Sequence, residues 1–153
     1  AGAAVVGCDP ITDRADIAKR MGAVAAGPAD LAATVQREAS SGRGADQVII
    51  TGGGADVLPW ATEILRDGGT VHFFAGDGGD ALPLRLETLY HRELTVTATY
   101  SSSPSDLAEA FGLIVSGAVA VERLVTHRIS LAGLHRGVDL TLRREAMKVY
   151  VTP

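Results

Sequence analysis

The chain has 153 residues and a mass of 15.8 kDa, and its composition, 46% hydrophobic and 21% charged, is typical of one modest soluble α/β domain rather than a disordered chain. Its net charge of −4 comes from interspersed acidic and basic residues, and no apolar run reaches the roughly 18 residues that cross a bilayer, so neither nucleic acid nor a membrane is an expected partner. Cys8 is the only cysteine, which excludes a disulfide or a cysteine-based metal cluster within one chain and fits a cytoplasmic location.

Apolar runs alternate with helical patterns along the chain, which predicts strand–helix–strand units in an α/β fold with a doubly wound parallel sheet. The predicted elements are, in chain order, strand 5–8, helix 13–21, strand 23–26, helix 29–39, strand 45–51, helix 57–65, strand 71–75, strand 94–100, a helix capped by Ser105, helix 131–142 and strand 148–151. In 94–100, apolar residues alternate with threonines, which predicts an edge strand with one less buried face. The serine-rich segment after this strand predicts a domain boundary near Tyr100.

Asp9 comes directly after the first predicted strand and precedes Pro10 and a helix. In a dinucleotide-binding fold, a carboxylate at this place accepts hydrogen bonds from both hydroxyls of the adenosine ribose, and its charge repels the 2′-phosphate of NADP. We therefore expect NAD as the cofactor, with NADP disfavoured. The alternative is a structural role, in which Asp9 accepts hydrogen bonds from the N–H groups of Ile11 and Thr12 at the start of the helix, and the two roles are compatible.

Two further places where a ligand can approach are predicted at the ends of neighbouring parallel strands. Thr51, Gly52 and Gly53 terminate one strand, and Ala75 and Gly76 terminate the next. In open parallel sheets ligands bind beyond such strand ends, and small residues let a ribose or a nicotinamide approach the backbone. Tight turning alone also explains the glycines, since glycine adopts positive φ readily.

The glycine-rich turn that binds the pyrophosphate in such folds is not found. A G-x-G-x-x-G turn is expected about twenty residues before the acidic residue, and eight residues precede Asp9. The sequence therefore predicts a sheet that lacks its first strand. In the strand order 3-2-1-4-5-6 that strand is central, so strand 5–8 and strand 45–51 are left with unpaired edges, and we expect a gap or a rearranged sheet between them.

Six segments, taken in order, resemble the medium-chain, zinc-type alcohol dehydrogenase family, and more narrowly its threonine and polyol dehydrogenase branch. They are GCDP followed by Arg14, then SGRGADQVIITGGG, ILRDGGTVHFFAG, RELTVTATYSSS, RLVTHRISL and MKVYV. The resemblance covers essentially the whole chain, but only the carboxyl-terminal part of a family member. It implies that residues 1–99 are a partial dinucleotide-binding (Rossmann) domain and that residues 100–153 return to the catalytic domain.

The resemblance also implies roles for single residues. Arg14 lies where relatives contact the adenosine, the backbone of 97–99 where they hold the carboxamide, and Lys148 where they reach the pyrophosphate. A solvated surface position is the alternative for both Arg14 and Lys148. Taken together, the cofactor-binding residues that we expect are Asp9, Arg14, Thr51, Gly52, Gly53, Ala75, Gly76, Thr97, Thr99 and Lys148.

By the same resemblance, the whole protein transfers a hydride between a secondary alcohol, such as a polyol, and NAD, with zinc as the Lewis acid. The zinc ligands and the proton relay of relatives come from an amino-terminal region that has no counterpart in these residues. We therefore expect no catalytic residue and no zinc ligand in this chain, and no activity of the chain alone. His91 and His127 lack partners at metal-ligand spacing and are expected to be structural, and Cys8 to be a small buried thiol.

Two other functions remain open. In a complete sheet, the strand before Asp9 would be the second one. An acidic residue that ends the second strand and a Leu-Arg-Asp-Gly-Gly turn also occur in S-adenosylmethionine-dependent methyltransferases, but the helix-rich segment after Pro104 argues against that fold. The other function is that of a non-catalytic module that binds a cofactor or dimerises. Relatives pair the edge strand found here at 94–100 across a two-fold axis, which predicts a homodimer or a tetramer.

Overall fold

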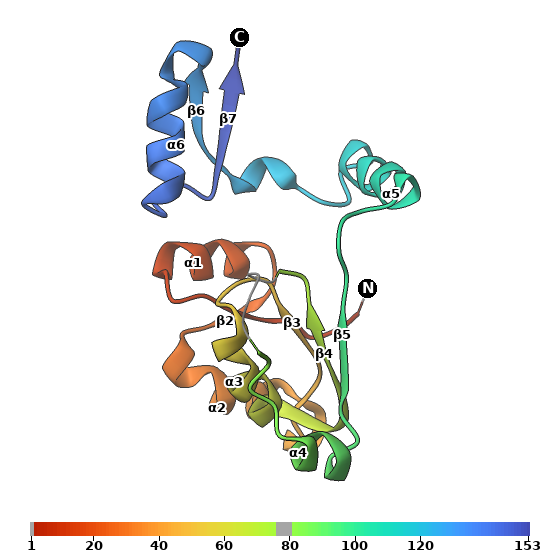
Figure 1. Ribbon diagram of the computed structural model, residues 1–153. Helices are drawn as coiled ribbons and strands as arrows, with labels where there is room; N and C mark the ends of the chain where they lie inside the picture. Colours follow the sequence, from red (N-terminus) through yellow and green to blue (C-terminus); the bar gives the residue numbers. More distant parts are fainter. Residues whose placement is uncertain (1, 76–80) are drawn as a thin grey trace. The chain divides into compact units, whose positions relative to one another are not determined.

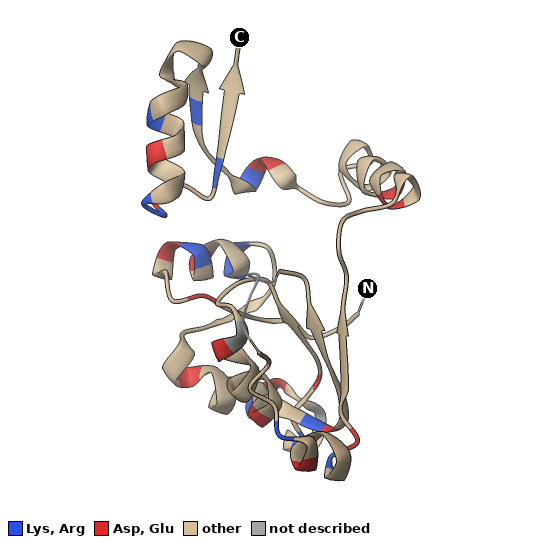
Figure 2. Cartoon of the chain, in the orientation of Figure 1, with Lys and Arg blue, Asp and Glu red and all other residues tan. Residues whose placement is uncertain are grey.

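The computed structural model describes residues 2–75 and 81–153 and divides the chain into two compact units (Figure 1). The first unit ends at Ser101, and the second comprises Ser102–Pro153. Within the described residues, no helix is both long and apolar enough to cross a membrane. Acidic and basic residues are interspersed along both units, and those that the structure describes form no continuous basic stripe (Figure 2).

The first unit begins with a small parallel pair of strands and its helices. Strand β1 (Val6–Cys8) is followed by helix α1 (Thr12–Arg20), strand β2 (Val24–Ala26), a 3₁₀ turn (Pro28–Asp30) and helix α2 (Leu31–Glu38). β1 pairs in parallel with β2, and α1 buries Ile17 as its one apolar residue of the core. Gly7 of β1 lets α1 approach closely, because a Cβ there would lie 3.0 Å from the Cβ of Ala18.

A three-stranded parallel sheet in the order β3-β4-β5 forms the rest of the first unit. Its elements are, in chain order, β3 (Ala45–Ile50), a 3₁₀ turn (Ala55–Val57), α3 (Leu58–Ile64), β4 (Leu65–Phe73), α4 (Leu86–His91) and β5 (Thr95–Ala98). Leu58 and Val71 are completely buried at the centre of a cluster whose other members are Ile50, Ala61, Leu65 and Leu94. The predicted edge position of β5 is confirmed, and its threonines lie on the exposed face.

The predicted gap in the sheet is also confirmed. Among the described residues no strand pairing joins β1 and β2 to the sheet β3-β4-β5. Helix α2 contacts both β1 and α3, and its buried side chains are Thr34 and Val35. Side-chain packing of a helix, rather than a hydrogen-bonded ladder, therefore connects the two sheets.

The GRGAD and DGG segments meet at the amino-terminal ends of β3 and β4. Gly44 has φ +97°, and a Cβ on it would lie 2.8 Å from the carbonyl oxygen of Ile64. Asp46 accepts hydrogen bonds from Arg66 at 2.6 Å and from Arg43 at 2.9 Å, and these hydrogen bonds and charges hold the pKa of the Asp46 carboxyl below its usual value. These residues of the family segments thus have a structural explanation.

Arg92 lies between α4 and β5, and its side chain binds the end of α3. Its guanidinium donates hydrogen bonds to the carbonyl oxygens of Thr62 and Leu65, where α3 ends and β4 begins, and to the carboxylate of Asp67 at 2.8 Å. The backbone N–H of Gly68 donates to the carbonyl oxygen of Arg92 at 2.8 Å. A side chain from a distant segment therefore satisfies carbonyls that a helix leaves unpaired at its carboxyl end.

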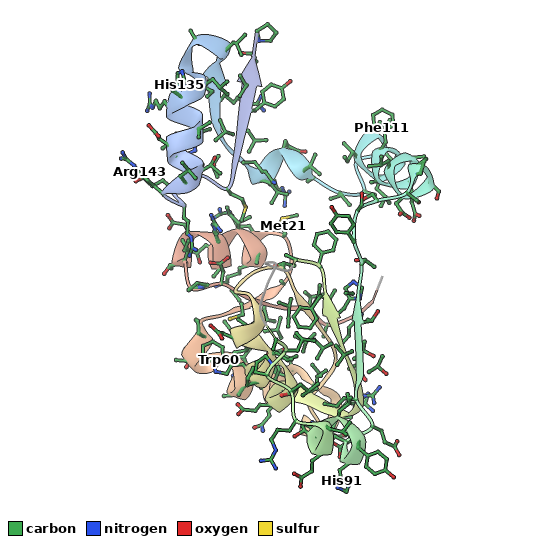
Figure 3. All side chains as sticks on the ribbon, viewed as in Figure 1. Met21, Trp60, His91, Phe111, His135 and Arg143 are labelled. Carbon is green, nitrogen blue, oxygen red and sulfur yellow. The ribbon has the colours of Figure 1, made fainter. Side chains whose placement is uncertain are left out.

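The second unit holds a separate strand–helix–strand motif. Its elements are α5 (Pro104–Val115), two 3₁₀ turns (Val121–Leu124 and Leu131–Gly133), β6 (Val125–Ser130), α6 (Leu134–Leu142) and β7 (Lys148–Thr152). β6 and β7 pair in parallel, and Gly137 of α6 packs against Ile129 and Val149 of these strands. On α5 large apolar residues are exposed, among them Phe111 (Figure 3).

The structure differs from the sequence prediction at several places. Helix α4 and strand β6 were not predicted, and β4 begins at Leu65 rather than at residue 71. The prediction that Ser105 caps α5 is wrong, because the capping box joins Ser103 and Asp106 and places Pro104 in the first turn. The prediction of a buried Cys8 is also wrong, since this side chain is exposed at the end of β1.

Candidate functional site

The candidate site begins at the carboxyl edge of the three-stranded sheet. The parallel register places Ile50 opposite Phe73 and Phe73 opposite Ala98, so the three strands end together. Beyond these pairs, the N–H groups of Phe74 and Ala75 donate to the carbonyl oxygen of Ile50 at 2.9 and 3.3 Å. In Figure 1 the arrows of β4 and β5 point the same way, as this register requires.

Thr51, Ala75 and Thr99 lie just beyond these strand ends, so the structure brings these three predicted residues to one edge. The N–H of Thr99 donates to the carbonyl oxygen of Phe73 at 3.2 Å, which extends the β4–β5 pairing by one residue. Thr97 lies opposite His72 of β4 in the same pairing. Ligands of open parallel sheets bind beyond such an edge.

The two predicted glycines after β3 have different structural roles. Gly53 has φ +91°, and a Cβ on it would lie 2.6 Å from Cγ1 of Val57, so the turn itself requires glycine there. Gly52 has no positive φ, and a Cβ on it would meet nothing within 4 Å. The fold therefore does not explain the small residue at position 52, which leaves open backbone beside the strand ends.

Asp9 lies half-buried at the junction between β1 and α1. Its Oδ1 accepts a hydrogen bond from the N–H of Ile11 at 2.8 Å, so the structural role predicted for this residue exists for Ile11. Among the described residues nothing donates to its Oδ2. One carboxylate oxygen orients the side chain, and the other is available to a hydroxyl donor.

Cys8 directly precedes Asp9, and Arg14 follows it by five residues. Arg14 lies half-buried in the first turn of α1, on the helix that Asp9 precedes. Partial burial, together with the negative charge of Asp9, raises the pKa of the Cys8 thiol above its usual value. Cys8 is therefore protonated at neutral pH and is a poor nucleophile despite its exposure.

Asp9 and Arg14 lie beside β1, and two other expected cofactor-binding residues are placed neither there nor at the edge of the three-stranded sheet. Gly76 lies outside the described residues. Lys148 is the first residue of β7 in the second unit, where it is exposed and its carbonyl oxygen accepts from the Thr126 hydroxyl at 3.3 Å. Its role at the pyrophosphate stays a prediction.

His72 is the residue at this edge that sequence reasoning missed. Its Nε2 lies 3.1 Å from the Thr99 hydroxyl. The histidines singled out from the sequence were His91, which contacts the Tyr90 ring, and His127, which contacts Thr126. The signal that could have found His72 is its place near the end of a strand whose neighbour carries two of the predicted residues.

No metal centre forms in residues 2–75 and 81–153, where no group of three or more histidine, cysteine, aspartate or glutamate side chains could hold a metal ion. The arrangement presents open backbone and backbone hydrogen-bonding groups at the sheet edge, where ligands of open parallel sheets bind. It does not gather the side chains that a zinc site or a proton relay needs.

Comparison with known proteins identifies similar chains. Residues 1–116 match the family model described as Zinc-binding dehydrogenase. The chain is 30% identical over 130 residues to a probable D-xylulose reductase A from Neosartorya fischeri, an alignment that covers 81% of this chain and 36% of the relative. It is 25% identical over 116 residues to a sorbitol dehydrogenase from Halalkalibacterium halodurans, with coverage of 76% and 34%.

Among solved structures, the alcohol dehydrogenase TADH from Thermus sp. ATN1 has a TM-score of 0.89 and 28% identity, over 99% of this chain and 44% of that one. The chain thus spans about a third of the length of the two curated relatives and less than half of the solved structure. The likeness confirms the predicted α/β fold as the Rossmann-like portion of such dehydrogenases, and the chain belongs to the zinc-binding dehydrogenase family.

Proposed function

We propose that this chain is part of an NAD-dependent, zinc-type dehydrogenase that transfers a hydride between a secondary alcohol, such as a polyol, and NAD. The chain contributes cofactor binding to that reaction, and we expect it to be inactive alone. The observation that carries the proposal is the Asp9 carboxylate at the end of β1 in a member of this family, with one oxygen engaged by Ile11 and the other available.

The residues at the two sheet edges suit the parts of the dinucleotide. A ribose with two adjacent hydroxyls needs acceptors that are fixed in place, and the hydrogen bond from Ile11 fixes the Asp9 side chain. At the other sheet, the open backbone at Gly52 and the backbone N–H and C=O groups of residues 97–99 suit a flat ring that carries a carboxamide. When bound, the nicotinamide supplies the hydride acceptor, and the protein residues named here hold and orient it.

Zinc chemistry does not fit the described residues of this chain, as they form no cluster of metal ligands. We therefore assign no catalytic residue here. The substrate class is inferred from the relatives, two of which are named a sorbitol dehydrogenase and a D-xylulose reductase. A cytoplasmic location likewise stays a prediction.

The proposal is tested by titrating the 153-residue chain with NADH and measuring energy transfer from Trp60, the only tryptophan. Trp60 is exposed on α3 (Figure 3), and no second tryptophan contributes to the emission that is measured. A saturable signal that is weaker for NADPH supports the proposal. No saturable signal contradicts it and leaves a module that only assembles, and competition by S-adenosylmethionine would favour the methyltransferase alternative.

The Asp9→Asn variant is expected to bind NADH about tenfold more weakly and to lose most of its preference for NADH over NADPH. Asparagine keeps an Oδ1 that can accept from Ile11, but it removes the charge that strengthens hydrogen bonds from the ribose and repels a 2′-phosphate. The same fluorescence titration, with urea unfolding in parallel, measures both effects. Asp13→Asn in the first turn of α1 removes an equal charge and is the matched control; equal losses in both variants would contradict the specific role of Asp9.

We further propose a homodimer or a tetramer that forms through strand β5. The support is that β5 is the edge of its sheet, with exposed Thr95 and Thr97 and no described strand on its outer side. Because Thr99 donates to β4, the alternation of a strand turns the N–H of Ala98 outward.

The Ala98→Pro variant is therefore expected to shift the assembly to a monomer, since it removes an outward donor and leaves the β4–β5 pairing in place. Light scattering after size-exclusion chromatography measures the mass of both proteins. A wild type that is monomeric, or an Ala98→Pro variant of unchanged mass, would contradict assembly through this edge.

A further inference from the structure

We infer that His72 is a positioning residue for the nicotinamide end of the dinucleotide site, an inference that rests on the proposed function. By the nicotinamide end we mean the backbone of residues 97–99, which we propose binds the carboxamide. His72 itself contributes no chemistry to hydride transfer. It fixes the segment that does the binding.

His72 lies on the face of β4 that is turned away from the core. Val71, its neighbour on β4, is completely buried in the core, so the alternation of a strand turns His72 to the opposite face. The pairing of β4 and β5 sets His72 opposite Thr97. His72, Thr97 and Thr99 therefore share one face of the strand pair.

The His72 ring bonds to the side chain of Thr99. Its Nε2 lies 3.1 Å from the Thr99 hydroxyl, and the tautomer of the ring decides which atom donates. The backbone N–H of Thr99 donates at the same time to the carbonyl oxygen of Phe73. Thr99 is thus held to β4 by its backbone and by its side chain.

The backbone leaves the sheet immediately after Thr99. Tyr100 is completely exposed and Ser101 has φ +64°, so the strand does not continue. Thr99 is the last residue that β4 holds before the second unit begins at Ser102. Without the His72 bond, one backbone hydrogen bond alone would fix the end of the segment, and a terminal bond of a strand frays easily.

The test compares two ligands, NADH and ADP-ribose, by calorimetry on the 153-residue chain. ADP-ribose has the adenosine, both ribose groups and the pyrophosphate, but it lacks the nicotinamide. The His72→Phe variant is expected to bind NADH about threefold to tenfold more weakly, the range for one neutral hydrogen bond, with ADP-ribose affinity unchanged. Thr99→Val breaks the same bond, so it should give a similar loss, and the double variant should show no further loss.

Controls separate this inference from the proposed function and from a stability effect. His72→Gln keeps a side chain with both a donor and an acceptor and should restore most of the NADH affinity. His91→Phe, at the exposed end of α4, should change neither ligand's affinity. If the wild type binds no NADH, the proposed function fails and this inference fails with it. If the wild type binds NADH but His72→Phe weakens both ligands equally or neither of them, the inference alone is overturned.

Discussion

Gly44→Ala is expected to lower the free energy of unfolding of the first unit by about 3 kcal/mol or more. Gly44 has φ +97°, where any L side chain is strained. A Cβ there would also lie 2.8 Å from the Ile64 carbonyl oxygen, 2.9 Å from the Arg66 nitrogen and 2.9 Å from the Leu65 carbonyl carbon. These atoms belong to the backbone, which cannot turn aside as a flexible side chain does, so the α3–β4 connection must move.

Urea unfolding of the variant and the wild type measures the effect. Gly42→Ala is the matched control, because Gly42 also has positive φ, +65°, but a Cβ on it would meet only the Gln36 carbonyl oxygen at 3.7 Å. It should lose about 1 kcal/mol, the cost of the backbone conformation alone. Equal losses at the two positions would show that crowding at Gly44 is unimportant.

Arg92→Met is expected to destabilise the same unit by about 2–3 kcal/mol. Methionine keeps much of the apolar stem, but it leaves the carbonyl oxygens of Thr62 and Leu65 without the charged donor that satisfies them. The Arg92 side chain is 28% exposed, so these bonds are largely shielded from water. The ion pair with Asp67 contributes little, because that carboxylate is 79% exposed.

The comparison with Asp67→Asn separates these contributions by urea unfolding at low and high salt. Asp67→Asn should cost less than about 1 kcal/mol, and salt should reduce that cost further. The loss in Arg92→Met should persist at high salt, since its larger part comes from bonds to carbonyls. A loss in Arg92→Met that disappears at high salt would assign its role to the ion pair instead.

The sequence predicted most of the fold because its local patterns and the resemblance pointed the same way. The strand–helix alternation, the edge position of β5 and the gap beside β1 are found in the structure. Helix α4 was missed because it has only six residues, too few for a helical period to repeat. The capping of α5 was misplaced by two residues because a run of serines offers several caps, and only the partner at Asp106 selects Ser103.

The residues of the candidate site that stand where strands end were predictable from the sequence, but the contacts between strands were not. Strand ends are sequence-local features, so Thr51 and Ala75 could be identified from where apolar runs stop, whereas Thr99 was indicated by the family resemblance. The bond between His72 and Thr99 spans 27 residues and depends on the register of two strands, which no local pattern fixes. For the same reason the difference between Gly52 and Gly53 emerges only from the three-dimensional surroundings of each.

The packing of α2 across the gap has a mechanical consequence. Asp9 belongs to one strand group and Thr51 to the other, and the span between them depends on side chains such as Val35 rather than on a ladder of backbone bonds. Contacts of that kind yield more readily to small displacements than a continuous ladder does. A dinucleotide bound at both Asp9 and Thr51 would restrict movement of the two strand groups relative to each other. Its binding should therefore slow amide hydrogen exchange in α2, the helix that packs between them.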